Sequence, residues 1–324
     1  MGLEWYIARR VAWAFVVTFI IISVTWGLLA ASPNPQVSNA VRSAAMNGDD
    51  PAEAREIQKK RLGLDEPLTK RYVDYMVSVY TLNWGWSQTR SQPVTEAVMN
   101  GLYYTVQYSI PWTILVILIS PLIGIYSAAN QYSWKDHAAT GFAFFGYAIP
   151  NFFFGIILLL IFGLQLGWIP ITYNTDVGVF SLANARQLAI PIFVLVTGSI
   201  GGTMRVARNE SAEFINADFV KTALAKGVSP FRIYARHIMR PTMVPLSTTV
   251  VGQLLALFTG ASLLVEVVFS IPGLGRLLFR SILAQDTSIV LGTSLFFVFI
   301  ATIGNLIQDL VYTVLDPRIS FSDR

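Results

Sequence analysis

The chain has 324 residues, of which 54% are hydrophobic and 13% are charged. Soluble domains average about 45–50% apolar and about 25% charged residues, so this composition excludes an ordinary soluble globular protein. The complete absence of cysteine excludes disulfides, thiolate zinc sites, iron–sulfur clusters and a cysteine nucleophile. The two histidines, His137 and His237, lie far apart in the sequence, so we expect no metal site. The net charge of +4 is modest, and its location matters more than its size.

Six apolar segments are long enough to cross a membrane as helices, because a hydrocarbon core of about 30 Å requires about 20 apolar residues. In chain order they are Val11–Ala31, Val106–Ala129, Ala138–Gly163, Leu188–Met204, Thr242–Val265 and Ser288–Gln308. We therefore predict an all-α integral membrane protein with six transmembrane helices. We expect Pro111 and Pro121 to kink the second helix, and the last helix to continue to Leu315. The first segment also has the basic start of a signal peptide, but it is long for one and five further segments follow.

Basic residues near the ends of these segments favour a topology with both termini in the cytoplasm. Arg9 and Arg10 precede the first segment, and an even number of spans returns the C-terminus to the same side. The segment 205–241 then faces the cytoplasm, and it carries seven Lys and Arg residues. The outer segment 32–104 has eight basic and eight acidic residues and is too long for the rule to apply. We divide the chain into 1–31 (cytoplasmic N-terminus and first transmembrane helix), 32–104 (extracytoplasmic segment) and 105–324 (a five-helix membrane core that includes the loop 205–241).

The outer segment has the signals of a folded, helical cap. Asp50, Pro51 and Glu53 combine an N-cap residue, a proline at the first helical position and an acid at the third, and Gly63 stands where this helix would end. A second amphipathic helix is predicted from about Leu68 to Tyr80. The alternative is a solvated spacer between spans.

The inner segment predicts a short helix over Asp218–Lys226, with an acid in the first turn and a base at the end, as the helix dipole favours. Gly227 supplies the left-handed residue that ends it.

A second short helix follows, with Ser229 as N-cap and Pro230 at the first position, and we expect it to end at about Arg240 before Pro241 and Pro245. Two helices joined at a sharp corner could insert into a cleft on a soluble partner. A basic loop lying on anionic lipid headgroups is the alternative.

This corner resembles the coupling loop of ATP-binding-cassette (ABC) importer permeases, the loop that docks on the ATPase subunit. The match to the general Glu-Ala-Ala-x-x-x-Gly core is partial, because Lys221 and Thr222 stand where that pattern has Glu and Ala. The match to the dipeptide, oligopeptide and nickel permease family is closer. It comprises Asp218-Phe-Val-x-Thr-Ala-x-Ala-Lys-Gly227, then His237, Arg240 and Pro245.

Further stretches spread this resemblance over nearly the whole chain. They are Leu62-Gly-Leu-Asp-Glu-Pro67 with Arg71-Tyr72, Trp84-Gly-Trp-Ser87, Gln92-Pro-Val94, Ile149-Pro-Asn-Phe152, Leu166-Gly-Trp-Ile-Pro170, Glu266-x-x-Phe269, Pro272-Gly-Leu-Gly275, Asp286, Asp309-Leu-Val-Tyr312 and Leu315-Asp-Pro-Arg-Ile319. The long outer segment resembles the first permease of the usual pair.

The resemblance implies the type I importer permease fold, located in the cytoplasmic (inner) membrane as a multi-pass subunit. It also implies a second homologous permease, two ABC ATPase subunits and an extracytoplasmic substrate-binding protein as partners, in addition to membrane lipid; we expect no nucleic-acid partner. No Gly-Lys dipeptide occurs in the chain, so a phosphate-binding Walker A loop is absent. We therefore expect no cofactor and no enzymatic activity in this chain, with ATP and Mg²⁺ bound on the partner ATPases.

Three groups of residues are candidates for functional roles. The candidates for ATPase coupling are Asp218, Lys221, Thr222, Ala223, Lys226, Gly227, Ser229, His237 and Arg240. His237 and Arg240 could equally have a structural role against lipid or the neighbouring spans. Polar residues within spans, Gln253, Asn305 and Gln308, could line a path or form interhelical hydrogen bonds. Glu266, Pro272, Gly273 and Gly275 mark an outer loop or gate, in which the glycines form a tight turn before a short helix and Glu266 is an interfacial or helix-contact residue.

The predicted function is therefore an ATP-driven importer of dipeptides or oligopeptides, in which this chain forms half of the pathway. A nickel-chelate importer of the same family is an alternative, because substrate identity is not readable from the sequence. An ion-coupled secondary transporter is a second alternative, although the paired inverted spans and buried midplane charges of that class are not evident.

Overall fold

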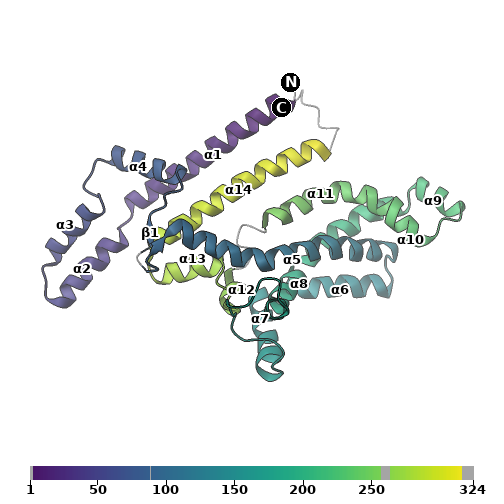
Figure 1. Ribbon diagram of the computed structural model, residues 1–324. Coiled ribbons are helices and arrows are strands. Elements are labelled where there is room, and N and C mark those ends of the chain that lie inside the picture. The colour runs from purple at the N-terminus through teal and green to yellow at the C-terminus, as the bar shows by residue number, and fades with distance from the viewer. Residues whose placement is uncertain (1–2, 88, 257–262, 316–324) are drawn as a thin grey trace. The chain divides into compact units, whose positions relative to one another are not determined.

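The computed structural model describes residues 3–87, 89–256 and 263–315, with side chains except at 244, 245, 248, 250, 251, 253–256 and 310–315. The described chain is helical apart from loops and one short hairpin (Figure 1). Strands β1 (Trp86–Ser87) and β2 (Gln92–Pro93) form this hairpin as an antiparallel pair.

Four long helices correspond to predicted membrane spans. They are α1 (Leu3–Ala31), α5 (Val94–Ala129), α8 (Leu182–Ile215) and α14 (Thr287–Leu315). Each contains a window that is long and apolar enough to cross a membrane, and a bent helix pair adds a fifth candidate. The predicted segment Thr242–Val265 coincides with α11 (Met239–Ala256) and α12 (Leu263–Val268), but residues 257–262 between them lie outside the described ranges. The all-α membrane fold is confirmed, while six spans and their orientation stay a prediction.

The predicted span Ala138–Gly163 is broken in the middle rather than formed by one continuous helix. Helix α6 (Trp134–Ala148) is followed by α7 (Asn151–Leu158) and the π-helix η1 (Leu159–Gln165), and the two arms meet at 96°. Ile149 is extended, with φ −91° and ψ 127°, and Pro150 follows it. Proline lacks an N–H and disfavours helical backbone at the residue before it, and the helix breaks at this point.

The described chain divides into two compact units, and the first comprises mainly Gly101–Arg276. Its core contains Tyr108, Trp112 and Leu195, which are at most 5% exposed. Helices α6 and α8 pack closely where Gly146 meets the backbone of Thr197, since a Cβ at position 146 would lie 2.4 Å from that carbonyl oxygen. Small residues at helix interfaces allow such approach within membranes.

The second unit comprises Glu4–Asn100 and Leu277–Ile303. It contains α1, the short helices α2 (Pro35–Asn47), α3 (Pro51–Arg61) and α4 (Leu68–Tyr80), the hairpin, most of α13 (Leu274–Leu283) and the first half of α14. Ile22, Met76, Val79 and Leu295 form its buried cluster. The predicted helices at 51–61 and 68–80 are confirmed, with Asp50 accepting a hydrogen bond from the Ala52 N–H at 2.8 Å.

Helix α2 was missed by the sequence analysis. It begins after Asn34, whose side chain accepts hydrogen bonds from the N–H groups of Gln36 and Val37, and it ends before Gly48 in the left-handed conformation. These are the same cap signals that predicted α3.

Candidate functional site

The inner corner is built by α9 (Asp218–Ala225), α10 (Pro230–Arg232) and the π-helix η2 (Ile233–Ile238). Lys226 follows the first helix and Gly227 adopts φ +74°, with its N–H donating to the Leu224 carbonyl. Val228 N–H then donates to the Ala223 carbonyl at 3.1 Å. This double closure, with glycine in the left-handed position, is the Schellman arrangement that turns the chain sharply. The predicted first helix and its glycine stop are therefore confirmed.

The predicted end of the second helix at Arg240 was wrong. Helical backbone continues from Pro230 through η2 into α11, and Pro241 and Pro245 lie inside α11. Pro241 lies just after the π-helical turn of η2, where the backbone already departs from the α-helical hydrogen-bond pattern, so the missing N–H does not end the helix. Ser229 occupies the N-cap position, but its side chain forms no capping hydrogen bond.

One face of the corner is buried. Val220, Ala223, Ile233 and Ile238 form a cluster with Ile125 of α5, and each is at most 6% exposed. Ala223 therefore packs inward, and its small side chain lets α9 approach its neighbours closely. The cluster joins the corner to a long helix.

The other face of the corner is exposed and carries most of the predicted coupling residues. They are Asp218, Lys221, Thr222, Lys226, Gly227 and Ser229, while His237 is half-buried. Lys221 pairs with Asp218 at 3.1 Å. Ala223 is buried in the same corner, whereas Arg240 is exposed but lies beyond it, in α11.

Three apolar side chains on this exposed face were missed by the sequence analysis. Phe219 is 46% exposed, Leu224 is 54% exposed and Phe231 is 82% exposed. Lys221 and Lys226 are exposed on the same corner, so its surface carries apolar and basic side chains together. An aromatic residue in a strongly basic loop was the signal that could have identified it.

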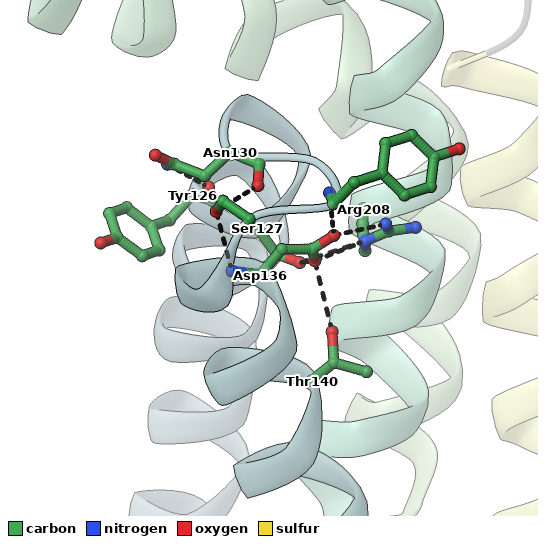
Figure 2. Close-up of polar contacts among 8 residues, drawn as sticks. Tyr126, Ser127, Asn130, Asp136, Thr140 and Arg208 are labelled. Atoms are coloured by element: carbon green, nitrogen blue, oxygen red, sulfur yellow. Dashed lines mark hydrogen bonds and ion pairs between the residues drawn. The ribbon is translucent and has the colours of Figure 1, made fainter.

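A buried ion pair fixes α5, α6 and α8 to one another (Figure 2). Asp136 is 3% exposed and accepts two hydrogen bonds from the Arg208 guanidinium, at 3.0 Å from Nε and 2.8 Å from Nη2. Ser127 Oγ also donates to this carboxylate, as does the Tyr132 N–H at 3.0 Å. Two parallel bonds to a carboxylate hold the guanidinium in a fixed orientation. Sequence analysis did not single out either residue.

The outer candidate residues meet around Glu266, which is fully buried. Thr105 Oγ1 and Tyr108 Oη donate to Glu266 Oε1 at 2.7 Å each, and the Arg276 N–H donates to Oε2 at 2.9 Å. Glu266 therefore contacts α5 through Thr105 and Tyr108, which is the helix-contact role predicted for it.

The glycine turn lies directly on this carboxylate. A Cβ at Gly273 would stand 2.2 Å from Glu266 Oε1, so only glycine fits there without a shift. A Cβ at Gly275 would lie 2.6 Å from the Cα of Leu263. The turn leads into the short helix α13, as predicted, and Pro272 precedes it. Glu266 therefore latches the outer turn to α5.

Comparison with known families identifies the chain. Residues 120–321 match the model for the binding-protein-dependent transport system inner membrane component, and residues 3–109 match the N-terminal model of the corresponding membrane component. The chain belongs to this family of transporter permeases. The oligopeptide transport system permease protein AppB of Bacillus subtilis is 31% identical over 98% of this chain and 99% of its own length. The dipeptide transport system permease protein DppB of B. subtilis is 28% identical over 97% of both chains.

A solved structure supports the fold. The MetNI methionine ABC transporter in an inward-facing conformation aligns with a TM-score of 0.52 at 14% identity, over 68% of this chain and 96% of that chain. The predicted importer permease fold is therefore confirmed. As a permease of this family, the chain is an inner-membrane subunit that works with an ATPase and a substrate-binding protein.

The predicted path-lining residues of this permease do not gather at a described site. Asn305 is exposed and Gln308 is half-buried on α14, and the side chain of Gln253 lies outside the described set.

A buried polar network instead links α5 and α8 to the loop between η1 and α8. Tyr173 Oη lies 3.2 Å from Gln107 Oε1 and 3.0 Å from Asn184 Oδ1, and Asn184 Nδ2 donates to Gln107 at 3.0 Å. Gln187 accepts from the Asn174 N–H at 3.0 Å. Sequence analysis missed this network because its members are spread over 80 positions of the chain.

The described part of the permease contains no group of three or more His, Cys, Asp or Glu side chains that could hold a metal ion.

Proposed function

We propose that this permease is one of two homologous membrane subunits of an ABC importer that carries dipeptides or oligopeptides into the cytoplasm. The chain-long similarity to relatives named for oligopeptide and dipeptide transport supports this substrate class. The exposed corner carries the proposal, because an apolar and basic surface on a rigid turn is suited to docking into a cleft on a soluble subunit. Aromatic residues in such surfaces commonly supply most of the binding free energy.

In this proposal the six spans leave both termini in the cytoplasm, and the corner faces the ATPase there. Two ATPase subunits bind ATP and Mg²⁺, and this chain performs no covalent chemistry. An extracytoplasmic binding protein delivers the peptide to the outer face. The translocation path runs between this chain and the second permease.

The packing of the corner suggests how motion reaches the membrane. Val220, Ala223, Ile233 and Ile238 contact Ile125, so a displacement of the corner also displaces the end of α5. The Asp136–Arg208 pair ties the same end of α5 to α6 and α8. Close-packed interiors move as bodies because they deform little, so closure of the ATPases would move these helices together.

The decisive test changes the corner without touching the spans. Gly227→Val places a β-branched residue at φ +74°, which side chains of that kind strongly disfavour, although no atom lies within 4 Å of the new Cβ. We expect the variant to insert normally but to lose ATPase co-purification and transport. Gly227→Asn is the matched control, because asparagine adopts this conformation at small cost. Undiminished co-purification and transport in Gly227→Val would contradict the coupling role.

A second variant tests the surface rather than the turn. Phe231→Ala leaves the backbone unchanged and removes the most exposed apolar side chain of the corner, so we expect weaker ATPase binding and reduced peptide-stimulated ATP hydrolysis. Uptake of labelled dipeptides, oligopeptides and nickel chelates in liposomes with the matching binding protein assigns the substrate. Uptake driven by a proton gradient without ATP or ATPase would favour a secondary transporter instead.

A further inference from the structure

The second unit contains a cavity of about 620 Å³ that the proposed transport function does not use. It lies where α1 ends and α2 begins, and α3, α4 and the start of α14 complete its walls. Trp26, Leu29 and Leu291 provide apolar walls from the two long helices. Arg55, Lys59 and Arg71 provide the basic walls from α3 and α4.

The cavity is strongly unbalanced in charge. Its described lining contains these three cations and no acidic residue. Lys59 lies 3.0 Å from Glu56, but that carboxylate is 65% exposed and outside the lining. The described residues form no ion pair with Arg55 or Arg71. A cavity with three cations and no carboxylate in its lining favours an anion with several acceptor oxygens.

Tyr75 supplies an additional donor at the same place. It lines the cavity, and its hydroxyl oxygen is buried without a hydrogen-bond partner among the described residues. Burying an unpaired hydroxyl is unfavourable, so a ligand that accepts its hydrogen bond would remove that cost.

The length of α1 places the cavity near one end of a membrane-crossing helix. Ala31 lies 21 positions after Arg10, a rise of roughly 32 Å at 1.5 Å per residue, which matches the thickness of a hydrocarbon core. Trp26 and Tyr75 are the residue types that concentrate where acyl chains meet headgroups. With Arg10 on the cytoplasmic side, as proposed above, the cavity opens at the outer leaflet.

We propose that this cavity binds the phosphate of an anionic phospholipid headgroup, with the lipid chains against the apolar wall. The phosphate oxygens accept from Arg55, Lys59, Arg71 and the Tyr75 hydroxyl. The acyl chains follow Trp26 and Leu29 along α1. A free phosphate satisfies the cations but leaves the apolar half of the cavity unfilled, which favours the lipid. The bound lipid would fix the outer helices α2 to α4 to the membrane surface.

The test measures lipid binding to the full chain in mild detergent by native mass spectrometry, separately from transport. The probes are phosphatidylglycerol, phosphatidylcholine and inorganic phosphate. The variant Arg55→Gln/Lys59→Gln/Arg71→Gln removes the cavity cations. The matched control Lys60→Gln/Arg61→Gln/Lys70→Gln removes three charges from the same two helices, at exposed positions outside the lining.

We expect the native chain to retain phosphatidylglycerol in preference to phosphatidylcholine. The cavity variant should bind it roughly tenfold or more weakly, and the control should bind it as the native chain does. Ala30→Phe, which fills the cavity and leaves every charge in place, should also release the lipid and guards against misfolding of the triple variant.

If the cavity variant and the control lose phosphatidylglycerol binding equally, the loss reflects net charge and the proposal is overturned. Unchanged phosphatidylglycerol binding in the cavity variant would also overturn it. Displacement of the lipid by millimolar inorganic phosphate would assign the site to a free anion instead. If the native chain transports peptide but does not retain lipid, the lipid site is wrong and the proposed function is unaffected. If it retains lipid but does not transport peptide, the proposed function is wrong and the lipid site is unaffected.

Discussion

Two buried carboxylates of the first unit are held in contrasting ways. Asp136 accepts both bonds of a guanidinium and is also bound by a hydroxyl and a backbone N–H. Glu266 is held by two hydroxyls and a backbone N–H. The first arrangement depends on an opposite charge that comes from another helix. The second depends on uncharged donors and on a glycine turn that leaves room for the carboxylate.

The two carboxylates are therefore sensitive to different substitutions. A buried ion pair contributes little net stability as a pair, but loss of one partner leaves an uncompensated charge. A carboxylate bound by hydroxyls and N–H groups is sensitive instead to the number of acceptor oxygens it offers. Asp286 in the second unit belongs to the latter kind, since Ser87 and Thr89 donate to it at 2.6 Å and 2.5 Å.

We expect the largest loss of stability when the Asp136–Arg208 pair is broken. Arg208→Leu leaves Asp136 buried without its guanidinium, and we expect the free energy of unfolding to fall by about 3 kcal/mol in mixed-micelle denaturation. Arg205→Leu removes the same charge from an exposed position on α8 and should change it by less than about 0.5 kcal/mol. The double variant Asp136→Leu/Arg208→Met should recover much of the loss. A double variant no more stable than Arg208→Leu would mean that the pair contributes more than charge compensation.

An intermediate effect is expected at the outer latch. Glu266→Gln keeps one oxygen for Thr105 and Tyr108 but places an NH₂ group against the Arg276 N–H, so two donors face each other. Leaving such groups unpaired costs about 2 kcal/mol in the same denaturation assay. Glu213→Gln, at an exposed position on α8, is the control. A fully stable Glu266→Gln would show that Glu266 already behaves as a neutral group.

The smallest effect concerns Asp286, which lies before the first residue of α14. Burial opposes its ionisation, but hydrogen bonds from Ser87, Thr89 and the Ile289 N–H together hold its pKa below the ordinary value. A carboxyl whose pKa is lowered by folding stabilises the fold above its unfolded pKa of about 3.9, and this stabilisation is lost as the pH falls through the folded pKa. The difference in unfolding temperature between the native chain and Asp286→Asn should therefore be largest near neutral pH and shrink below about pH 4. A difference that does not change with pH would contradict this assignment.

Local signals in the sequence predicted several elements well. Asp50 and Pro51 begin α3 as expected, and Gly227 turns the inner corner in the left-handed conformation. Asn34 and Gly48 carried equivalent signals for α2 and were overlooked. Such cap residues act on backbone groups a few positions away, so their effect is readable from a short stretch of chain.

Two prolines with the same local signal have different structural outcomes. Pro150 breaks an apolar segment into two arms at 96°, whereas Pro241 lies in a helix that continues. Both lack an N–H, but Ile149 before Pro150 is extended, whereas Pro241 follows the π-helical turn of η2 within a helix that continues. Hydrophobic length predicted a span at 138–163 and the prolines predicted a helix end at 240, and neither local signal distinguished these two outcomes.

The sequence by itself determined that this chain is a helical membrane protein, which family it resembles and which residues form the inner corner. Those conclusions depend on composition, local caps and an ordered set of motifs, all of which are properties of neighbouring positions. Tertiary packing is needed to show which polar groups share a buried site. Arg208 and Asp136 are 72 positions apart, and Thr105 and Glu266 are 161 positions apart. A buried charge must find its donors wherever packing brings them, and no local rule specifies the partner.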